Sequence, residues 1–137
     1  KGRLVKPNLT PDTFEELAGA ISLYLTELGA ALPTLVNADK RPDYLFRSSP
    51  AWQAFGVLGN SLFELDDVGE RTEALAKIGE EKLDWRRTNL KWDNILGSKQ
   101  VEKNASGKVT REWITPRASR QAVDSTIAHL KKSAGLE

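Results

Sequence analysis

The fold class rests on residues 10–33, which read TPDTFEELAGAISLYLTELGAALP. Thr10 can cap a helix, and Pro11 suits the first helical position because its missing N–H is not needed there. Apolar residues then recur at steps of three and four, with two more beside them: Phe14, Leu17, Ile21, Tyr24, Leu28 and Ala31, then Leu25 and Leu32. This period predicts a long amphipathic helix that ends near Pro33. A coiled-coil seam is the alternative use of such a stripe, but packing on a local core is the commoner outcome.

A second helix is expected after a connector. Ser49-Pro50 repeats the signal of a capping residue followed by proline, and segment 51–65 places its large apolar residues on one face: Trp52, Phe55, Leu58 and Leu62. We expect Trp52, Phe55 and Leu58 to be buried against three residues of the first helix: Leu17, Ile21 and Leu28. Gly56 and Gly59 each weaken the second helix by up to ~1 kcal/mol relative to alanine, but they allow close approach to the first.

A third helix is predicted over residues 68–81. Asp66-Asp67 can cap it, and Glu70 lies in its first turn, where a carboxylate suits the helix dipole. Its inward residues are expected to be Val68, Leu75 and Ile78. Residues 33–48 form the connector between the first two helices, with Asn37, Asp39 and Pro42, and residues 1–9 are basic and irregular, as the end of a linker would be.

The helical period fades after Leu83, and a hairpin signal follows. Val101 and the stretch Val109–Trp113 flank the turn residues Asn104-Ala105-Ser106-Gly107. Thr115-Pro116 then predicts the start of the last helix, which runs to about Ser133 and stops at Gly135. The sequence therefore predicts a mainly α fold: one compact helical domain over residues 1–137, of about four helices, with a small β-hairpin before the last helix.

Length and composition fit one globular domain, because 137 residues with 39% apolar side chains can bury a core. No stretch approaches the ~18 uninterrupted apolar residues of a membrane-spanning helix, and no secretory leader is visible. The chain has no cysteine, which excludes disulfides and thiolate metal sites and fits a cytoplasmic protein. It begins at Lys1 and contains no methionine, so we expect it to be part of a longer protein.

The net charge of +1 hides an uneven distribution. Residues 1–65 carry 6 basic and 7 acidic side chains, or −1, and residues 66–81 carry 2 and 6, or −4. Residues 82–137 carry 12 basic and 6 acidic side chains, or +6. This excess indicates either an anionic partner or a solvated basic surface that balances the acidic third helix.

Nothing in the sequence predicts an enzyme, a cofactor site or a metal site. His129 is the only histidine and has no cysteine to join it, so a metal cluster or a catalytic triad is not expected. Neither the phosphate-binding loop nor the dinucleotide-binding glycine motif occurs, and Gly97-Ser98-Lys99 is too short to stand for one. We expect His129 to lie on the surface or along a groove.

Two tryptophans, Trp85 and Trp92, bracket Arg86 and Arg87 in the segment without periodicity. Tryptophan beside arginine can stack on bases or bind phosphate. The alternative, which we favour, is that both indoles anchor the segment to the helical core. In that case the arginines are exposed or meet a carboxylate of the third helix, and the two candidates are Glu73 and Glu80.

The last helix combines a buried stripe with a basic flank. At 100° per residue, the buried stripe consists of Val123, Ile127, Leu130 and Ala134. One flank carries Arg117, Arg120 and Lys131, and the hairpin upstream adds Lys99, Lys103, Lys108 and Arg111. A basic flank beside a buried stripe is typical of a helix that faces DNA, and first-turn amides near Arg117 would add to a phosphate contact. Pairing of Arg120 with Asp124, four residues later, is the competing interpretation.

The sequence also resembles a known family. The run Leu83-Asp84-Trp85-Arg86-Arg87-Thr88-Asn89, then Trp92 and the ending Leu130–Leu136, is similar to the C-terminal region of the DGQHR-domain (DndB) family of DNA sulfur-modification proteins. The segments Gly2–Pro7 and Ala51–Gly59 are also similar to that region. The namesake Asp-Gly-Gln-His-Arg motif is absent, so this chain would be the C-terminal part alone. The resemblance implies a bacterial regulator that binds DNA and represses genes of DNA phosphorothioation.

We therefore expect a DNA-binding domain that contacts double-stranded DNA electrostatically. The predicted DNA-binding residues are Lys108, Arg111, Arg117, Arg120 and Lys131. The rival hypothesis is a protein-interaction or oligomerisation domain of the same protein, with the apolar stripe of the first helix as its surface. Other DNA-modification proteins, or further copies of the chain, would then be its partners.

Overall fold

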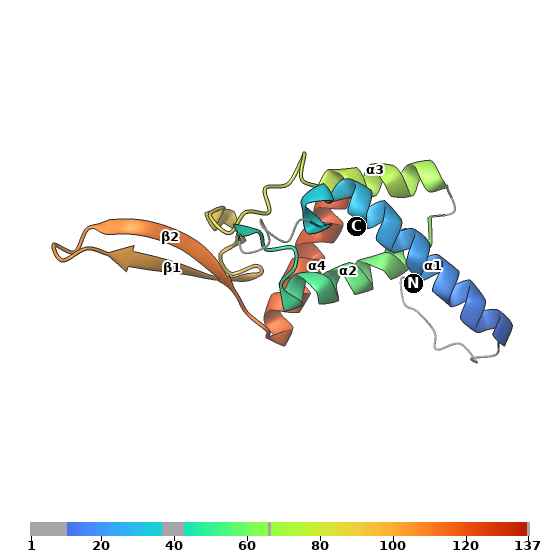
Figure 1. Ribbon diagram of the computed structural model, residues 1–137, viewed down its shortest axis with the longest axis horizontal. Helices are drawn as coiled ribbons and strands as arrows, with labels where there is room; N and C mark the ends of the chain where they lie inside the picture. The colour runs from blue at the N-terminus through green and yellow to red at the C-terminus, as the bar shows by residue number, and fades with distance from the viewer. Residues whose placement is uncertain (1–10, 37–42, 66, 137) are drawn as a thin grey trace.

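A computed structural model describes residues 11–36, 43–65 and 67–136, apart from the side chains of residues 11–14 and of Val36. Its elements follow in the order α1 (Pro11–Ala31), η1 (Pro33–Val36), α2 (Ser49–Leu62), α3 (Val68–Ile78), η3 (Leu90–Trp92), β1 (Gly97–Lys103), β2 (Val109–Pro116) and α4 (Arg120–Ala134). The mainly α prediction, with a hairpin before the last helix, is confirmed (Figure 1). Several predictions lie outside the described residues: the linker end at 1–9, the Thr10 cap, the side chain of Phe14, the connector residues Asn37, Asp39 and Pro42, and Asp66.

The helix boundaries follow the predicted capping signals in most places. Asp67 caps α3 by accepting a hydrogen bond of 2.7 Å from the Gly69 amide. Gly135 ends α4 in the left-handed conformation, with φ of 75°, as predicted for a C-terminal stop. Before α2, the N-cap position is held by Ser48, whose hydroxyl donates to the Leu45 carbonyl instead of capping the helix.

Two helix boundaries differ from the prediction. The last helix begins at Arg120, because Ser119 supplies the cap by accepting from the Ala122 amide at 3.2 Å. Thr115-Pro116 ends strand β2 instead, where Thr115 pairs with Ser98. Helix α3 ends at Ile78, three residues early. Gly79 packs there so closely on α1 that a Cβ atom would lie 2.6 Å from the Ala31 carbonyl oxygen.

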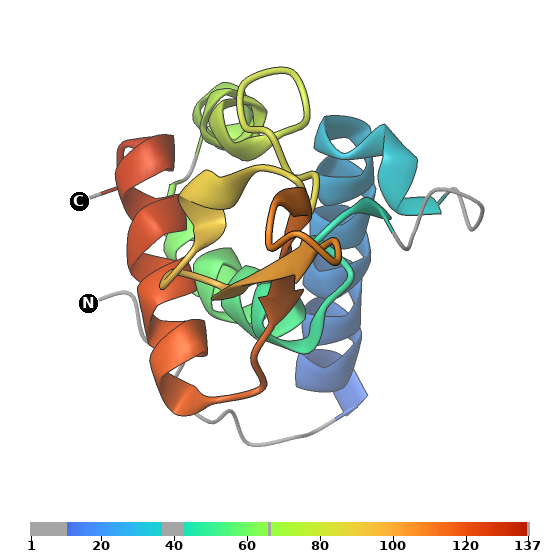
Figure 2. The same cartoon turned by 90° about the vertical axis from the view of Figure 1, so that its left-hand side faces the viewer.

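The core lies among the four helices and the irregular segment between α3 and β1. Helices α2 and α3 pack on α4, and α3 also packs on α1. In the end-on view α1 and α4 lie on opposite sides of the molecule (Figure 2). The largest fully buried side chains include Trp85 and Trp92, so the prediction that both indoles anchor their segment is confirmed.

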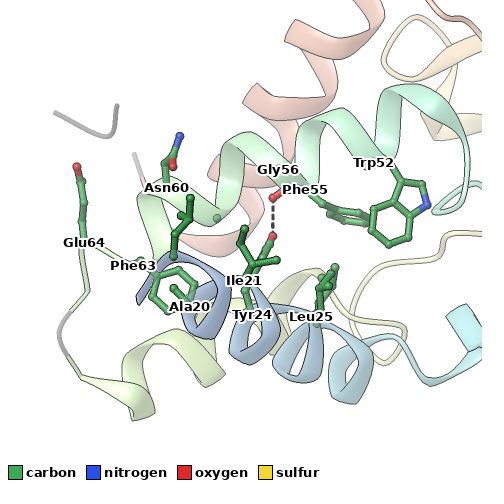
Figure 3. A pocket seen from close by; sticks show the side chains of 13 residues that line it. Ala20, Ile21, Tyr24, Leu25, Trp52, Phe55, Gly56, Asn60, Phe63 and Glu64 are labelled. Atoms are coloured by element: carbon green, nitrogen blue, oxygen red, sulfur yellow. Dashed lines mark hydrogen bonds between the residues drawn. The ribbon is translucent and has the colours of Figure 1, made fainter. Parts of the chain in front are cut away.

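The expected tight packing of α1 on α2 is only partly correct. Phe55 and Leu58 of α2 and Leu28 of α1 are buried as predicted, but Ile21 and Trp52 are 50% and 38% exposed. The hydroxyl of Tyr24 donates to the Phe55 carbonyl at 2.6 Å, and its ring keeps the helices apart, so an apolar groove lies between them (Figure 3). Val68, predicted to point inward, is 58% exposed at the start of α3.

Candidate nucleic-acid interface

Strands β1 and β2 form a two-stranded antiparallel arm that projects away from the helices (Figure 1). Every residue from Lys99 to Arg111 is exposed. The turn is held by the side-chain oxygen of Asn104, which accepts from the amides of Ser106 and Lys108, each at 3.0 Å. Gly107 adopts a positive φ of 82°, which suits glycine in this tight turn. Local hydrogen bonds within the turn thus order the tip of the arm.

The root of the arm is fixed to the core. Ile114 is fully buried, and its amide donates to the Arg87 carbonyl at 2.7 Å. After β2, the Arg117 amide donates to the Leu96 carbonyl at 3.1 Å. At Gly97 a Cβ atom would lie 2.0 Å from the Thr115 carbonyl oxygen, so only glycine fits where the strands meet the core. These contacts fix the orientation of the arm relative to the helical core.

The arm and the start of α4 concentrate positive charge. Residues 97–120 contain six basic side chains and two acidic ones, a net charge of +4. Lys99 lies 3.6 Å from Glu112 across the strands. Lys103 and Lys108, at the tip, make no ion pair within the part of the chain that the structure describes. The positive charge is thus least neutralised at the end farthest from the helices.

One face of the arm carries arginine stacked on tryptophan. The guanidinium of Arg111 lies 4.3 Å from the ring centroid of Trp113, and that of Arg87 lies 5.9 Å from it. Residues two apart in a strand share a face, so the alternation of Arg111 and Trp113 could have signalled this contact. The guanidinium of Arg111 therefore makes a cation–π contact with this indole.

The remaining predicted DNA-binding residues lie on or beside α4. Arg117 precedes the helix, so its predicted place in the first turn is wrong, although it borders a small hollow of about 50 Å³ with Ser119. Arg120 begins α4 and pairs with Asp124 at 3.2 Å, as the competing interpretation expected. Lys131 is half-buried in the last turn, about 16 Å along the helix axis from Arg120. The structure therefore places Lys108 and Arg111 on the arm and Arg117 at its root, and it places Lys131 at the far end of α4.

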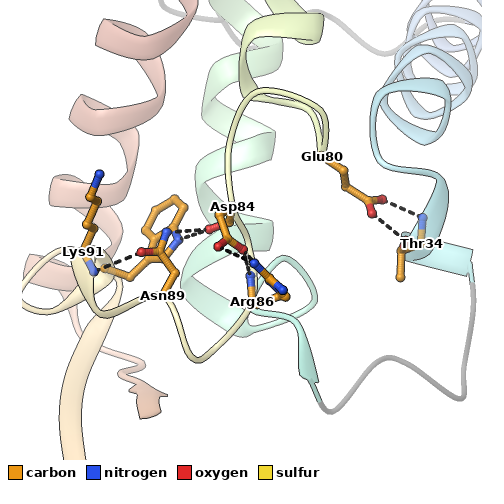
Figure 4. Close-up of polar contacts among 7 residues, drawn as sticks. Thr34, Glu80, Asp84, Arg86, Asn89 and Lys91 are labelled. Atoms are coloured by element: carbon orange, nitrogen blue, oxygen red, sulfur yellow. Dashed lines mark hydrogen bonds and ion pairs between the residues drawn. The ribbon is translucent and has the colours of Figure 1, made fainter. Parts of the chain in front are cut away.

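Residues 84–92 form a network of local hydrogen bonds (Figure 4). The Asp84 carbonyl accepts from the side chains of Asn89 and Trp92, at 2.8 and 2.7 Å. The Asp84 carboxylate accepts from Arg86 at 2.9 Å, and this hydrogen bond lowers the pKa of the carboxyl below its usual value. The indole N–H of Trp85 donates to the Ile78 carbonyl. The polar groups of Asp84, Trp85, Arg86 and Asn89 are therefore occupied by hydrogen bonds that order this segment.

Of the two alternatives for these arginines, exposure or pairing with helix α3, Arg86 follows the first: its side chain is exposed and makes no ion pair with α3 among the described residues. Arg86 binds Asp84, two residues away in sequence. Glu80 instead accepts from the backbone amide and hydroxyl of Thr34, tying the end of α3 to η1 (Figure 4). Glu73 lies 3.8 Å from Lys77 on its own helix. Arg86 and Glu73 thus each take a partner within four residues in the sequence, which needs less chain ordering than a contact between elements.

His129 lies half-buried against the core. Its ring meets that of Trp92 edge-on, with centroids 5.1 Å apart. Burial, and then the charge of Lys132, lower the pKa of this imidazole below its usual value. Among the described residues no group of three or more histidine, aspartate or glutamate side chains is placed to hold a metal ion.

Comparisons with protein-family models, curated proteins and solved structures found no match. Within the described residues no helix has the length and apolar character needed to cross a membrane. Two surfaces stand out by their chemistry. One is the basic arm, whose residues were predicted in part. The other is the apolar groove between α1 and α2, whose α1 wall belongs to the apolar stripe that the rival hypothesis named and whose α2 wall was expected to be buried.

Proposed function

We propose that this chain is a DNA-binding module that contacts duplex DNA with its basic arm and with the turn that leads into α4. The observation that carries the proposal is the projection of exposed Lys103, Lys108 and Arg111 from a rigidly rooted ribbon. Positive side chains on such a ribbon release the counterions of several phosphates at once. Arg117 extends the same charge toward α4.

The dimensions of the arm fit a groove of DNA. Strands of seven and eight residues span roughly 25 Å at about 3.3 Å per residue. The major groove is about 12 Å wide and admits a two-stranded ribbon. The turn consists of Asn104, Ala105, Ser106 and Gly107, so it lacks the large apolar wedge with which some arms unstack base pairs. Contact with phosphates along a groove, without intercalation, is the mode that these residues support.

The biological setting is proposed from the resemblance of residues 83–89 to the DGQHR-domain family. In that setting the module belongs to a bacterial regulator of DNA phosphorothioation genes, and its DNA contact serves repression. The segment around Asp84 and Trp85 then supports the root of the arm, because the carbonyl of the nearby Arg87 accepts a hydrogen bond from the Ile114 amide in β2.

Titration of duplex DNA at several salt concentrations tests the proposal. Replacing three arm residues, as Lys103→Gln/Lys108→Gln/Arg111→Gln, should weaken binding to all sequences and reduce the slope of log K against log salt by about 3, since each phosphate contact contributes about 0.9. The matched control removes three positive charges elsewhere, as Lys77→Gln/Lys82→Gln/Lys132→Gln, and should leave the slope within about 1 of the wild type.

The result has clear alternatives. If the arm variant and the control lost the same affinity for duplex DNA, the loss would depend only on the net charge of the chain. That result would contradict a defined interface on the arm. Absence of duplex binding by the wild-type chain at low salt would overturn the proposal. A loss confined to one sequence, by about 1–3 kcal/mol for a single arginine, would indicate that the arm reads base edges as well as phosphates.

A further inference from the structure

The groove between α1 and α2 is a second surface with different chemistry. It encloses about 610 Å³ and is lined mainly by apolar side chains, among them Ile21, Leu25, Trp52 and Phe55. Ile21 and Leu25 are 50% and 48% exposed, and Trp52 lies at the Leu25 end (Figure 3). Large apolar side chains that gather at one exposed groove mark a binding surface.

The shape of the groove fits a helix. Its α1 wall runs from Leu17 to Leu28, which is about 16 Å or three helical turns. A partner helix places apolar residues at i, i+3 or i+4, and i+7 over that length. Gly56 lies in the opposite wall, and a Cβ atom there would meet nothing within 4 Å, so the middle of the groove is open. The Tyr24 hydroxyl is already bonded to Phe55, which leaves few polar groups to orient a small ligand.

The charged residues beside the groove indicate which kind of helix it can bind. Helix α1 contains four acidic residues and no lysine or arginine, and α2 contains no charged residue. One of the four, Glu27, is paired with Arg71 of α3 at 3.2 Å, so its charge is already neutralised. Glu64 lines the end of the groove next to Asn60 (Figure 3). A helix with basic flanks would complement these walls, whereas a second copy of α1 would bring like charges together. Helix α4 of another copy carries lysines, but its apolar stripe is buried in its own core.

We propose that this groove binds an amphipathic helix with basic flanks from another protein. The apolar anchors of that helix lie along Ile21, Leu25 and Trp52, and its positive side chains lie toward Glu64 at one end of the groove. This surface is separate from the basic arm, so the inference does not depend on DNA binding. It gives the chain one contact for an anionic partner and another for a cationic one.

Two synthetic 18-residue peptides test the proposal. Both carry leucine at helical spacing, one with lysine and the other with glutamate at the polar positions. The full chain should bind the leucine–lysine peptide at least tenfold more tightly than the leucine–glutamate peptide, measured by fluorescence anisotropy at physiological salt. Ile21→Ser/Leu25→Ser should weaken that binding at least tenfold. Leu23→Ser is the matched control, because Leu23 is 45% exposed on α1 but does not line the groove, and it should change affinity less than twofold.

A second variant distinguishes loss of peptide binding from loss of folding. Gly56→Gln adds a side chain to open space in the groove and should block the peptide while the circular dichroism of the chain is retained. Equal affinity for the two peptides, no binding of the leucine–lysine peptide, or equal loss in Leu23→Ser would overturn the proposal. A concentration-dependent dimer, detected by light scattering and abolished by Ile21→Ser/Leu25→Ser, would assign the groove to a second copy instead and would also overturn it.

Discussion

The indole rings of Trp85 and Trp92 stack with centroids 4.7 Å apart and an angle of 30° between their planes. Each indole N–H donates to a backbone carbonyl, that of Trp85 to Ile78 and that of Trp92 to Asp84. Both polar edges are thus satisfied while both rings are buried. This pair orders a segment that has no regular period, and it supports the root of the arm from inside the core.

Phe55→Ala should lower the free energy of unfolding by about 3–5 kcal/mol. The Phe55 ring is buried and lies 5.5 Å from the Trp85 ring, so its removal leaves a cavity beside the tryptophan stack. Urea unfolding followed by circular dichroism measures the change. The control Val57→Ala, on the exposed side of the same helix, should cost much less. A loss at Phe55 no larger than at Val57 would show that the face of α2 is assigned wrongly.

Gly97→Ala should destabilise the chain, because its Cβ atom would overlap the Thr115 carbonyl oxygen at the root of the arm. The two strands would have to separate there, and the neighbouring Leu96 and Ile114 are fully buried. Gly56→Ala is the matched control, since the same methyl group enters open space on a helix and should stabilise by about 0.5–1 kcal/mol. Thermal unfolding of both variants separates the two effects, and a shift of equal sign would contradict the close approach at Gly97.

The local signals in the sequence predicted most of the architecture. Asp67 and Gly135 define helix ends through their own backbone or side-chain geometry, and these positions could be read without knowledge of the fold. Thr115-Pro116 failed because the same dipeptide suits the end of a strand, and pairing with β1 decides between the two. The hairpin signal at 104–107 indicated a strand after the turn but not its length, so the sequence did not show that this strand extends to Pro116.

The surfaces were harder to predict than the elements. Helical periodicity places Ile21 and Trp52 on inward faces, but it does not set the distance between two helices. That distance depends on the ring of Tyr24, which lies so close to Gly59 that a Cβ atom there would be 3.0 Å from the ring. Similarly, the charge count identified Lys108 and Arg111 but gave no sign that the hairpin projects beyond the core. Tertiary packing fixes both properties.

Stability should fall as the pH is lowered from 7 toward 5, in part through His129. Burial lowers the pKa of this imidazole in the folded chain below the value of 6.5 that is expected when it is unfolded. Below about pH 6.5 the unfolded chain therefore binds a proton that the folded chain takes up only at lower pH, so protonation favours unfolding. Melting temperatures across this range should fall more steeply for the wild type than for His129→Gln. Parallel curves would show that the imidazole titrates alike in both states.

The turn that leads into α4 offers a graded test of the DNA proposal. Arg117 is exposed and makes no ion pair among the described residues, so Arg117→Gln should lower the salt slope of duplex binding by about 1. Arg120 shares its charge with Asp124, so Arg120→Gln should have a smaller effect. The pair is exposed, with 90% and 58% of the two side chains open to solvent, and Asp124→Asn should therefore strengthen binding at little cost in stability.

The double variant Arg117→Glu/Arg120→Glu decides whether this turn belongs to the interface. If it does, two reversed charges next to the arm should weaken duplex binding well beyond the neutral variants, because phosphates are then repelled as well as unpaired. Lys131→Gln serves as the comparison: it removes one charge from the same flank of α4, about 16 Å away, and should change affinity least. Circular dichroism establishes that each variant is folded. Wild-type affinity in a folded double variant would restrict the DNA contact to the arm itself.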